Sequence, residues 1–346
     1  MNLDRVTIRP IIDSLQLLKI SDEVYFSEQY ADYVSNSRLG LINPEQGGSP
    51  QKFFDGFAGN KSFSDSFIFG SAVHEQLLQP DFFEICESVN RPTGKVGFIS
   101  DLLYNKNHIY PTNDEIMNAV IDVDYYHGIL SESIFNKLKQ ELFSYFNSRW
   151  EYEKNRNEDK DIIYLDEKSR EKFHECMDNL NNNALIQQLL HPVSIVEPVI
   201  SLNENAIILH VEATVDDSKP FIVKLKSKLD NFTIDRECNL ITVNDLKTHG
   251  RAIDIFSDSI LNFHYYREIA MYSTLLSMVC AKYYHMPNPD VKGNFLVVST
   301  IPPYSTQVFR MTRELFKKGI EEFHKLLKMV CYYTYYGFQD KEEIIL

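Results

Sequence analysis

The segment from Val223 to Thr248 constrains the fold more than any other part of the chain. Alternating and β-branched residues flank a polar, turn-prone stretch from Asp235 to Asn239. This pattern predicts two β-strands joined by a hairpin. Side chains on a strand point alternately to its two faces. The first strand therefore presents charged side chains on one face: Lys224, Lys226, Lys228 and Asp230.

On the second strand the same period of two places apolar and then charged residues on one face: Ile241, Val243, Asp245 and Lys247. The apolar pair predicts a buried central strand, so the charged pair at its end needs a binding partner. A metal is one candidate, because Asp230 and Asp245 would offer hard oxygen ligands to Mg²⁺ or Mn²⁺ from neighbouring strands. The backbone carbonyl of Leu246 is a further candidate ligand.

Lys247, two residues beyond Asp245, could orient a water molecule or offset charge that develops on a phosphate. Two carboxylates and a lysine in this arrangement are typical of phosphodiester hydrolysis. An Asp and a Lys two residues apart on a strand are more often an ion pair on a solvated face, however. The triplet alone therefore leaves both interpretations open.

The charge balance excludes a generally basic, nucleic-acid-coating protein, because the formal net charge is −14 and phosphate binding needs local Lys and Arg. A nuclease needs positive charge only along its groove. Lys226 and Lys228 are candidate phosphate contacts on the lysine face of the first strand. The alternative for this face is that it is simply solvated.

The cysteines and the apolar segments limit the cellular context. The 5 cysteines include no C-x-x-C pair, so we expect neither a disulfide framework nor an iron-sulfur cluster, as in a reducing cytosol. The N-terminus lacks a signal-type apolar run, and the longest largely apolar segment, Ile269 to Ala281, is too short to span a bilayer. We therefore expect a soluble, cytoplasmic protein without a membrane partner.

The pattern along the chain predicts three regions: a mainly helical N-terminal part over 1–90, a helical elaboration over 91–190, and a core sheet with C-terminal helices over 191–346. Within the first we expect a helix from Ile11 to Ile20. Within the last we expect strands from Ile195 to Leu202 and from Ala206 to Thr214, joined by a turn at Asn203 to Asn205. A helix from Ser259 to Tyr284 and another from Arg313 to Tyr335 follow.

Other candidate residues lie outside the hairpin. His74 sits beside the apolar stripe of a helix that contains Gly70, Ser71 and Ala72; it is either a partly buried core histidine or a ligand held on a rigid helix. Glu197 is another candidate acidic group, with a solvated edge-strand residue as the alternative. Glu268 and Tyr272 are four residues apart and share a helix face.

Four of these motifs, in this order, resemble the PD-(D/E)xK nuclease superfamily: G-S-A-V-H-E at 70–75, L-D at 229–230, D-L-K-T at 245–248 and E-x-x-x-Y at 268–272. Within the superfamily the chain is most similar to RecB-like exonucleases, in particular the phage exonuclease VIII (RecE) type. The opening S-x-S-R-L at 35–39 is similar as well. The resemblance covers roughly residues 35–90 and 195–285.

The resemblance implies an α/β, restriction-endonuclease-like core, in which a central mixed β-sheet is flanked by helices, with a helical insertion. It implies that His74, Asp230 and Asp245 bind divalent metal and that Lys247 assists the attacking water. Tyr272 would contact the DNA backbone or brace the site. The family's Gln is Glu268 here, and a carboxylate there would repel phosphate unless it is protonated, paired or bound to metal.

The implied activity is a Mg²⁺- or Mn²⁺-dependent deoxyribonuclease, an exonuclease that degrades double-stranded DNA from its ends in phage-type recombination or repair. The resemblance also implies ring-forming oligomers and an annealing recombinase as partner. Two alternatives remain open: a catalytically silent nucleic-acid-binding or interaction protein on the same fold, and a structure-specific endonuclease.

Overall fold

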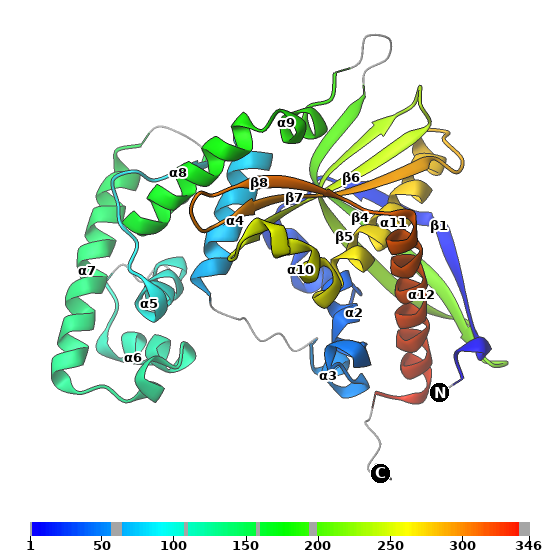
Figure 1. The fold of residues 1–346 in the computed structure, drawn as a ribbon. Helices are drawn as coiled ribbons and strands as arrows, with labels where there is room; N and C mark the ends of the chain where they lie inside the picture. Colours follow the sequence, from blue (N-terminus) through cyan, green and yellow to red (C-terminus); the bar gives the residue numbers. More distant parts are fainter. Residues whose placement is uncertain (1, 57–63, 107–109, 157–159, 194–198, 339–346) are drawn as a thin grey trace. The chain divides into compact units, whose positions relative to one another are not determined.

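The chain forms two compact units in the computed structural model, which describes residues 2–56, 64–106, 110–156, 160–193 and 199–338 (Figure 1). The first unit combines residues 1–60 with 179–346, and the second comprises residues 61–178. This division assigns residues 61–90, which we expected to belong with the N-terminal part, to the second unit. The second unit is thus an insertion in the sequence of the first.

A six-stranded sheet forms the centre of the first unit, in the order β1-β4-β5-β6-β7-β8. Only β6 and β7 pair in parallel; the other neighbours are antiparallel. The sheet is therefore mixed, as expected for the α/β class. Its strands are β1 (Val6–Leu18), β4 (Ile200–Val215), β5 (Phe221–Asp235), β6 (Leu240–His249), β7 (Asp290–Ser299) and β8 (Thr306–Arg310).

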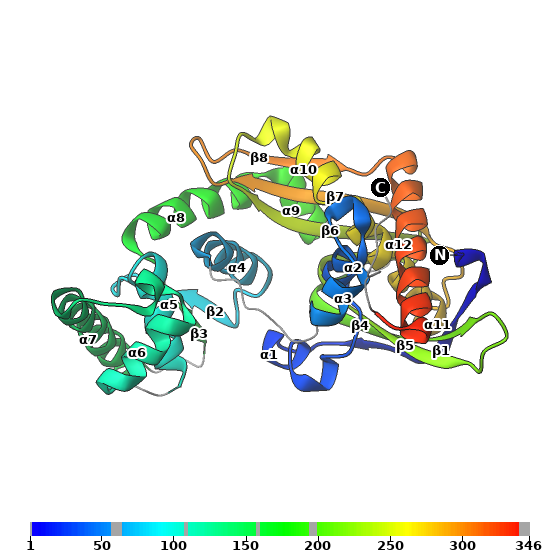
Figure 2. The ribbon, with the colours of Figure 1, turned by 90° about the horizontal axis from the view of Figure 1, so that it is seen from below.

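The helices of the first unit pack their apolar sides against this sheet. In α11 (Tyr265–Tyr283) and α12 (Arg313–Tyr336), which lie side by side in Figures 1 and 2, buried residues such as Leu276 and Phe323 join one core with the strands. Each large apolar side chain buried in this way stabilises the fold by about 2 kcal/mol. The other α-helices of this unit are α1 (Asp22–Tyr25), α2 (Asn36–Ile42), α3 (Pro50–Asp55), α9 (Ala184–Leu190) and α10 (Phe256–Asn262).

The path of the chain through the sheet agrees with the expected restriction-endonuclease-like core. Three antiparallel strands, β4, β5 and β6, follow one another, and α11 then leads to β7, which runs parallel to β6. A parallel neighbour needs such a crossover connection. Among the described residues, none of the helices combines the length and apolar character that a bilayer crossing requires.

The second unit is mainly helical and has a core of its own, which includes Ile99, Leu142 and Phe146. This confirms the helical insertion. A short parallel pair of strands, β2 (Phe83–Ile85) and β3 (Asp161–Ile163), accompanies the helices. These helices are α4 (Asp65–Leu78), α5 (Gly94–Asn105), α6 (Asn113–Asp122), α7 (Glu132–Lys154) and α8 (Glu167–Asn182), the last of which extends into the first unit.

Three of the expected elements are wrong. The predicted helix from Ile11 to Ile20 is instead the second half of β1, which is extended because it pairs with β4. The predicted turn at Asn203 to Asn205 lies within β4, where Glu204 takes a left-handed backbone conformation (φ 53°) without ending the strand. The helix expected from Ser259 to Tyr284 is divided into α10 and α11, because His264 also has a positive φ (55°).

Candidate active site

The two strands of the predicted hairpin separate at the position of the two aspartates. Backbone pairing between β5 and β6 ends with Asn231 opposite Asn244, so Asp230 and Asp245 are the next residues on the two strands. Beyond this point β6 continues along β7, while β5 continues along β4. The backbone N–H of Leu246 donates to Oδ2 of Asp230 at 2.7 Å. A side-chain carboxylate thus replaces the backbone partner where the strands diverge.

Lys247 connects Asp245 with helix α11. Its Nζ lies 2.7 Å from Oδ2 of Asp245, which is 2 % exposed, and 3.4 Å from Oε2 of Glu268. The hydroxyl of Tyr272 donates to Oε1 of Glu268 at 2.9 Å. The structure therefore brings Asp245, Lys247, Glu268 and Tyr272 into one continuous chain of polar contacts. Of the three states considered for the Glu268 carboxylate (protonated, paired or bound to metal), these contacts fit the paired one.

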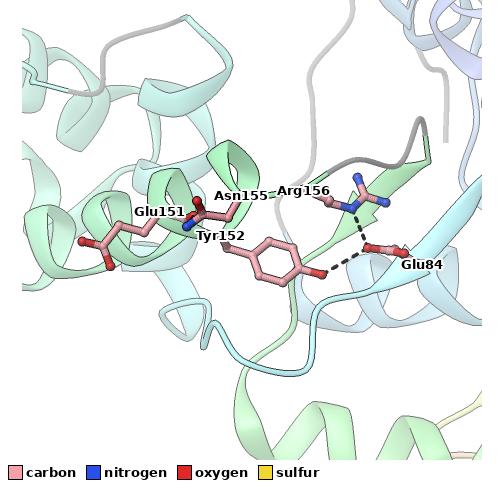
Figure 3. Close-up of a pocket in the computed structure, with 5 residues that line it drawn as sticks. All are labelled: Glu84, Glu151, Tyr152, Asn155 and Arg156. Carbon is pink, nitrogen blue, oxygen red and sulfur yellow. Dashed lines mark hydrogen bonds and ion pairs between the residues drawn. The ribbon is translucent and has the colours of Figure 1, made fainter.

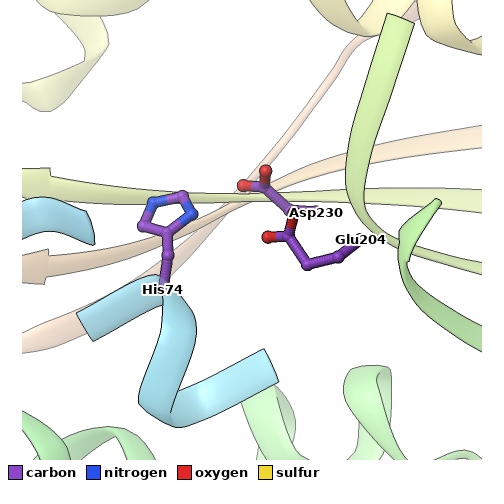
Figure 4. A group of neighbouring side chains, drawn as sticks. All are labelled: His74, Glu204 and Asp230. Atoms are coloured by element: carbon purple, nitrogen blue, oxygen red, sulfur yellow. The ribbon is translucent and has the colours of Figure 1, made fainter. Parts of the chain in front are cut away.

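The sequence analysis missed Glu204. It lies on β4 opposite Asp230, between the pairs Asn203 with Asn231 and Asn205 with Leu229, and a carboxylate oxygen of Glu204 lies within 4.8 Å of one of Asp230 (Figure 4). Glu204 is 9 % exposed and forms an ion pair with Lys228 at 2.8 Å. The available signal was an acidic residue shortly before the apolar run from Ala206 to Leu209.

The pKa values of the two aspartates are raised, mainly by burial. Burial raises the pKa of Asp230 to about 7; Lys247 opposes this shift, and the charges of Glu204 and Glu268 add to it. Burial also raises the pKa of Asp245 well above its ordinary value, with Lys247 opposing and Glu268 and Asp230 adding. Carboxylates that repel one another in a buried site favour a proton or a cation between them.

The cluster fits a divalent metal. Asp230, Asp245 and Glu204 offer the hard oxygen ligands that Mg²⁺ and Mn²⁺ prefer. Lys247 remains a cation in this setting: burial alone would lower its pKa, but Asp245, Glu268 and Asp230 raise it well above its ordinary value. We call Glu204, Asp230, Asp245, Lys247 and Glu268 the carboxylate cluster.

The sequence left two possibilities for the lysine face of β5, phosphate binding or simple solvation, and the contacts of Lys226 and Lys228 fit neither. Lys226 is 5 % exposed, and its amine donates to the carbonyl of Tyr25 at 2.8 Å and lies 4.4 Å from the centre of the Tyr25 ring. Burial lowers the pKa of Lys226 to about 8. Lys228 binds Asp22 as well as Glu204. These amines are bonded within the protein, so phosphate binding by Lys226 or Lys228 would require rearranged contacts.

The remaining predicted ligands keep the status of predictions. His74, also drawn in Figure 4, is a half-buried residue of α4 and belongs to the second unit. Leu246 is buried, and its N–H rather than its carbonyl has a contact with the cluster, through Asp230. Glu197 lies outside the described residues.

The second unit contains a surface pocket of about 440 Å³ that is lined by Glu84, Tyr152 and Arg156, among others (Figure 3). Glu84 accepts a hydrogen bond from the Tyr152 hydroxyl at 3.1 Å and forms an ion pair with Arg156 at 2.8 Å. These contacts satisfy the Glu84 carboxylate from within the unit. They connect β2 with the end of α7.

Comparison with known proteins gives a likeness in structure and none in sequence. No family model matches the chain, and no curated protein matches it. A similar solved structure is the crystal structure of a "putative exonuclease" from Eubacterium rectale, at 9% sequence identity and a TM-score of 0.48. The match covers 93% of this chain and 89% of that one.

Proposed function

We propose that this protein is a metal-dependent deoxyribonuclease, and specifically an exonuclease that degrades double-stranded DNA from its ends. The observation that carries the proposal is the carboxylate cluster at the point where β5 and β6 separate, with Asp230 and Asp245 on adjoining strands and Lys247 at 2.7 Å from Asp245. The four ordered motifs of the sequence support the same activity. Phage-type recombination, ring-shaped oligomers and a recombinase partner are predictions from the resemblance.

In this proposal Asp230, Asp245 and Glu204 hold Mg²⁺ or Mn²⁺. Ligation by the Leu246 carbonyl and by His74 stays a prediction from the sequence. The cation would supply Lewis-acid polarisation of the scissile phosphate. Hydrolysis forms a bond between a water oxygen and phosphorus and breaks the bond to the leaving sugar oxygen, which takes up a proton. The residues of the cluster must therefore place a water molecule and offset the charge that develops on phosphate.

Lys247 suits the second task. Because its pKa is raised well above the ordinary value, its amine stays protonated at neutral pH and donates hydrogen bonds. It therefore acts as a fixed cation beside the phosphate and does not remove the proton from water. Asp245 and Glu268 hold this amine from two sides.

Glu268 and Tyr272 act as positioning residues in this proposal. The Glu268 carboxylate is bound to Lys247 and to the Tyr272 hydroxyl, so its charge is balanced within the protein. The family that the chain resembles has Gln at this position, which would keep the hydrogen bond from Tyr272 but lose the ion pair with Lys247. Glu268→Gln should therefore retain activity, reduced by about tenfold or less.

The experiment that tests the function is digestion of end-labelled linear DNA and closed-circular DNA with Mg²⁺ or Mn²⁺. We expect the wild type to degrade linear DNA only and Lys247→Ala to lose about a hundredfold or more of this activity. Lys292→Ala, which removes an exposed lysine of β7 in the same sheet, is the matched control. Cutting of the circle would identify an endonuclease, and an inert wild type that still binds DNA would identify a binding protein.

A further inference from the structure

A row of asparagines, three buried and one half-buried, crosses four strands at the place where β5 and β6 separate. Asn203, Asn231, Asn244 and Asn294 stand opposite one another on β4, β5, β6 and β7. Asn231, Asn244 and Asn294 are 0 %, 1 % and 3 % exposed. Buried amides in the middle of a sheet are costly unless they are hydrogen-bonded. We call these four residues the asparagine ladder.

The side chains of the ladder bond to one another in a single direction. Nδ2 of Asn294 donates to Oδ1 of Asn244 at 2.8 Å, and Nδ2 of Asn244 donates to Oδ1 of Asn231 at 2.7 Å. Nδ2 of Asn231 then donates to Oδ1 of Asn203 at 2.7 Å. The chain of amides therefore connects all four central strands through side chains as well as through the backbone.

Helix α9 is hydrogen-bonded to the ladder through its last carbonyl groups. Nδ2 of Asn244 also donates to the carbonyl of Leu189 at 3.2 Å, and the hydroxyl of Ser201 accepts from Asn231 and donates to the carbonyl of Leu190. Asn244 precedes Asp245 on the strand, and neighbouring side chains of a strand point to opposite faces. The ladder thus lies on the face opposite the Asp245 carboxylate.

The ladder lies where it can hold two strands together at the end of their backbone pairing. Asn231 and Asn244 are the last backbone pair of β5 and β6, and each is directly next to a carboxylate of the cluster, Asp230 or Asp245. Beyond this pair the two strands follow different neighbours. The amide bridge between Asn231 and Asn244 joins the two strands at this last backbone pair, and the hydrogen bond from the Leu246 N–H to the Asp230 carboxylate follows directly beyond it.

We propose that Asn231 and Asn244 are positioning residues of the metal site: their amide bridge fixes β5 against β6 so that Asp230 and Asp245 face one divalent cation. This inference rests on the metal site of the proposed function. Asn294 and Asn203 complete the hydrogen bonding of the bridge from the outer strands. Asn294 has no neighbouring carboxylate, so it contributes to stability more than to metal binding, whereas Asn203 directly precedes Glu204 of the carboxylate cluster.

The test is the affinity for Mn²⁺ alone, without DNA, measured by isothermal titration calorimetry at a temperature where circular dichroism shows each variant to be folded. We expect Asn244→Ala to weaken Mn²⁺ binding by about tenfold or more, as is typical when residues that support metal ligands are removed. Thr242→Ala is the matched control, because Thr242 is a buried polar residue two positions earlier on the same face of β6. It should change the affinity by about twofold or less.

A second variant keeps the test decisive if Asn244→Ala does not fold. Asn231→Ser shortens the bridge from the other strand and should weaken Mn²⁺ binding to a similar extent. Asn294→Ala breaks the ladder beyond the bridge and should lower the melting temperature while it leaves the affinity unchanged. Equal loss of stability with unchanged Mn²⁺ affinity in the bridge variants would overturn the proposal, as would a wild type that binds no Mn²⁺.

The outcome is separable from that of the proposed function. A wild type that binds Mn²⁺ but hydrolyses no DNA would reject the nuclease while the role of the bridge still stands on the calorimetric result. A wild type that hydrolyses DNA, with bridge variants of normal Mn²⁺ affinity, would reject the positioning role alone.

Discussion

The Asp230 carboxyl group can bind a proton and, in the proposed function, a cation in its place; the proton connects pH with stability. In the metal-free protein its pKa is raised to about 7 from an ordinary value of 3.8. The folded state therefore binds this proton more tightly than the unfolded state does. The contribution of this group to the free energy of unfolding is therefore present at low pH and is lost as the pH rises through the pKa of the folded state.

We therefore predict that Asp230→Asn, which mimics the protonated form, raises the free energy of unfolding of the metal-free protein at pH 8 by about 1 to 2 kcal/mol. The free energy of unfolding of the variant should also change less between pH 5 and pH 8 than that of the wild type. Urea denaturation in the presence of EDTA measures both effects.

Added Mg²⁺ should reverse the order of the two proteins at pH 8. The wild type should gain stability from bound metal by mass action, and Asp230→Asn should gain little. Asp235→Asn, which replaces a half-buried carboxylate at the end of the same strand, serves as control and should respond to Mg²⁺ like the wild type. A wild type with no Mg²⁺ response would count against a metal site at Asp230.

At the scale of elements, the start of α11 is held by a buried charge network that does not take part in the proposed chemistry. Arg267, 2 % exposed, donates to Oε1 of Glu322 on α12 at 2.8 Å and to Oδ1 of Asn36 on α2 at 2.8 Å. Tyr266 and His264 also bond to Glu322. Because Glu268 follows Arg267 directly, this network fixes the helix end that carries a member of the carboxylate cluster.

Glu322→Ala should lower the free energy of unfolding by about 3 kcal/mol or more, because it leaves the Arg267 guanidinium buried without its carboxylate. Its neighbour offers a matched control: the Glu321 side chain is 67% exposed and forms a surface pair with Lys317 at 3.8 Å. Glu321→Ala should change the same quantity by about 0.5 kcal/mol or less. Chemical denaturation of both variants measures the difference, and equal effects would show that the network contributes no special stability.

Short-range sequence patterns predicted the elements whose periodicity is set locally. The alternation in β5 and β6 placed Asp230, Asp245 and Lys247 together, because a period of two fixes side-chain direction whatever the partner strand is. The same patterns failed for β1, whose extended form depends on pairing with a remote strand, β4. Glu204 was missed for a related reason. The turn-like composition around it predicts that a strand ends there, whereas β4 continues through Glu204 in a left-handed conformation.

The lysine face illustrates what a sequence pattern cannot give. Its alternation correctly separates Lys224, Lys226 and Lys228 from the apolar positions of β5, but the partners of these amines come from residues 22–32. Only the tertiary fold brings that segment onto the strand. A prediction of phosphate binding from the spacing alone therefore lacked the competing acidic partners Asp22 and Asp32.

At the scale of the whole molecule, two separate hydrophobic cores predict that unfolding is not a single two-state event. Leu276 belongs to the core of the first unit and Leu142 to that of the second, and each is 0 % exposed. Replacing either by Ala should cost about 2 to 5 kcal/mol in its own unit. We expect Leu276→Ala and Leu142→Ala to lower different transitions in differential scanning calorimetry; a single transition that both variants shift alike would contradict this.

The insertion of the second unit into the sequence of the first also affects the order of events during synthesis. The first strand of the sheet, β1, pairs with β4, for example Val6 with Val215, so its partner leaves the ribosome only after the whole second unit has been made. At typical rates of translation this delay is roughly ten to forty seconds. Throughout that time β1 presents unpaired backbone groups to solvent or to a chaperone, whereas the second unit can already fold.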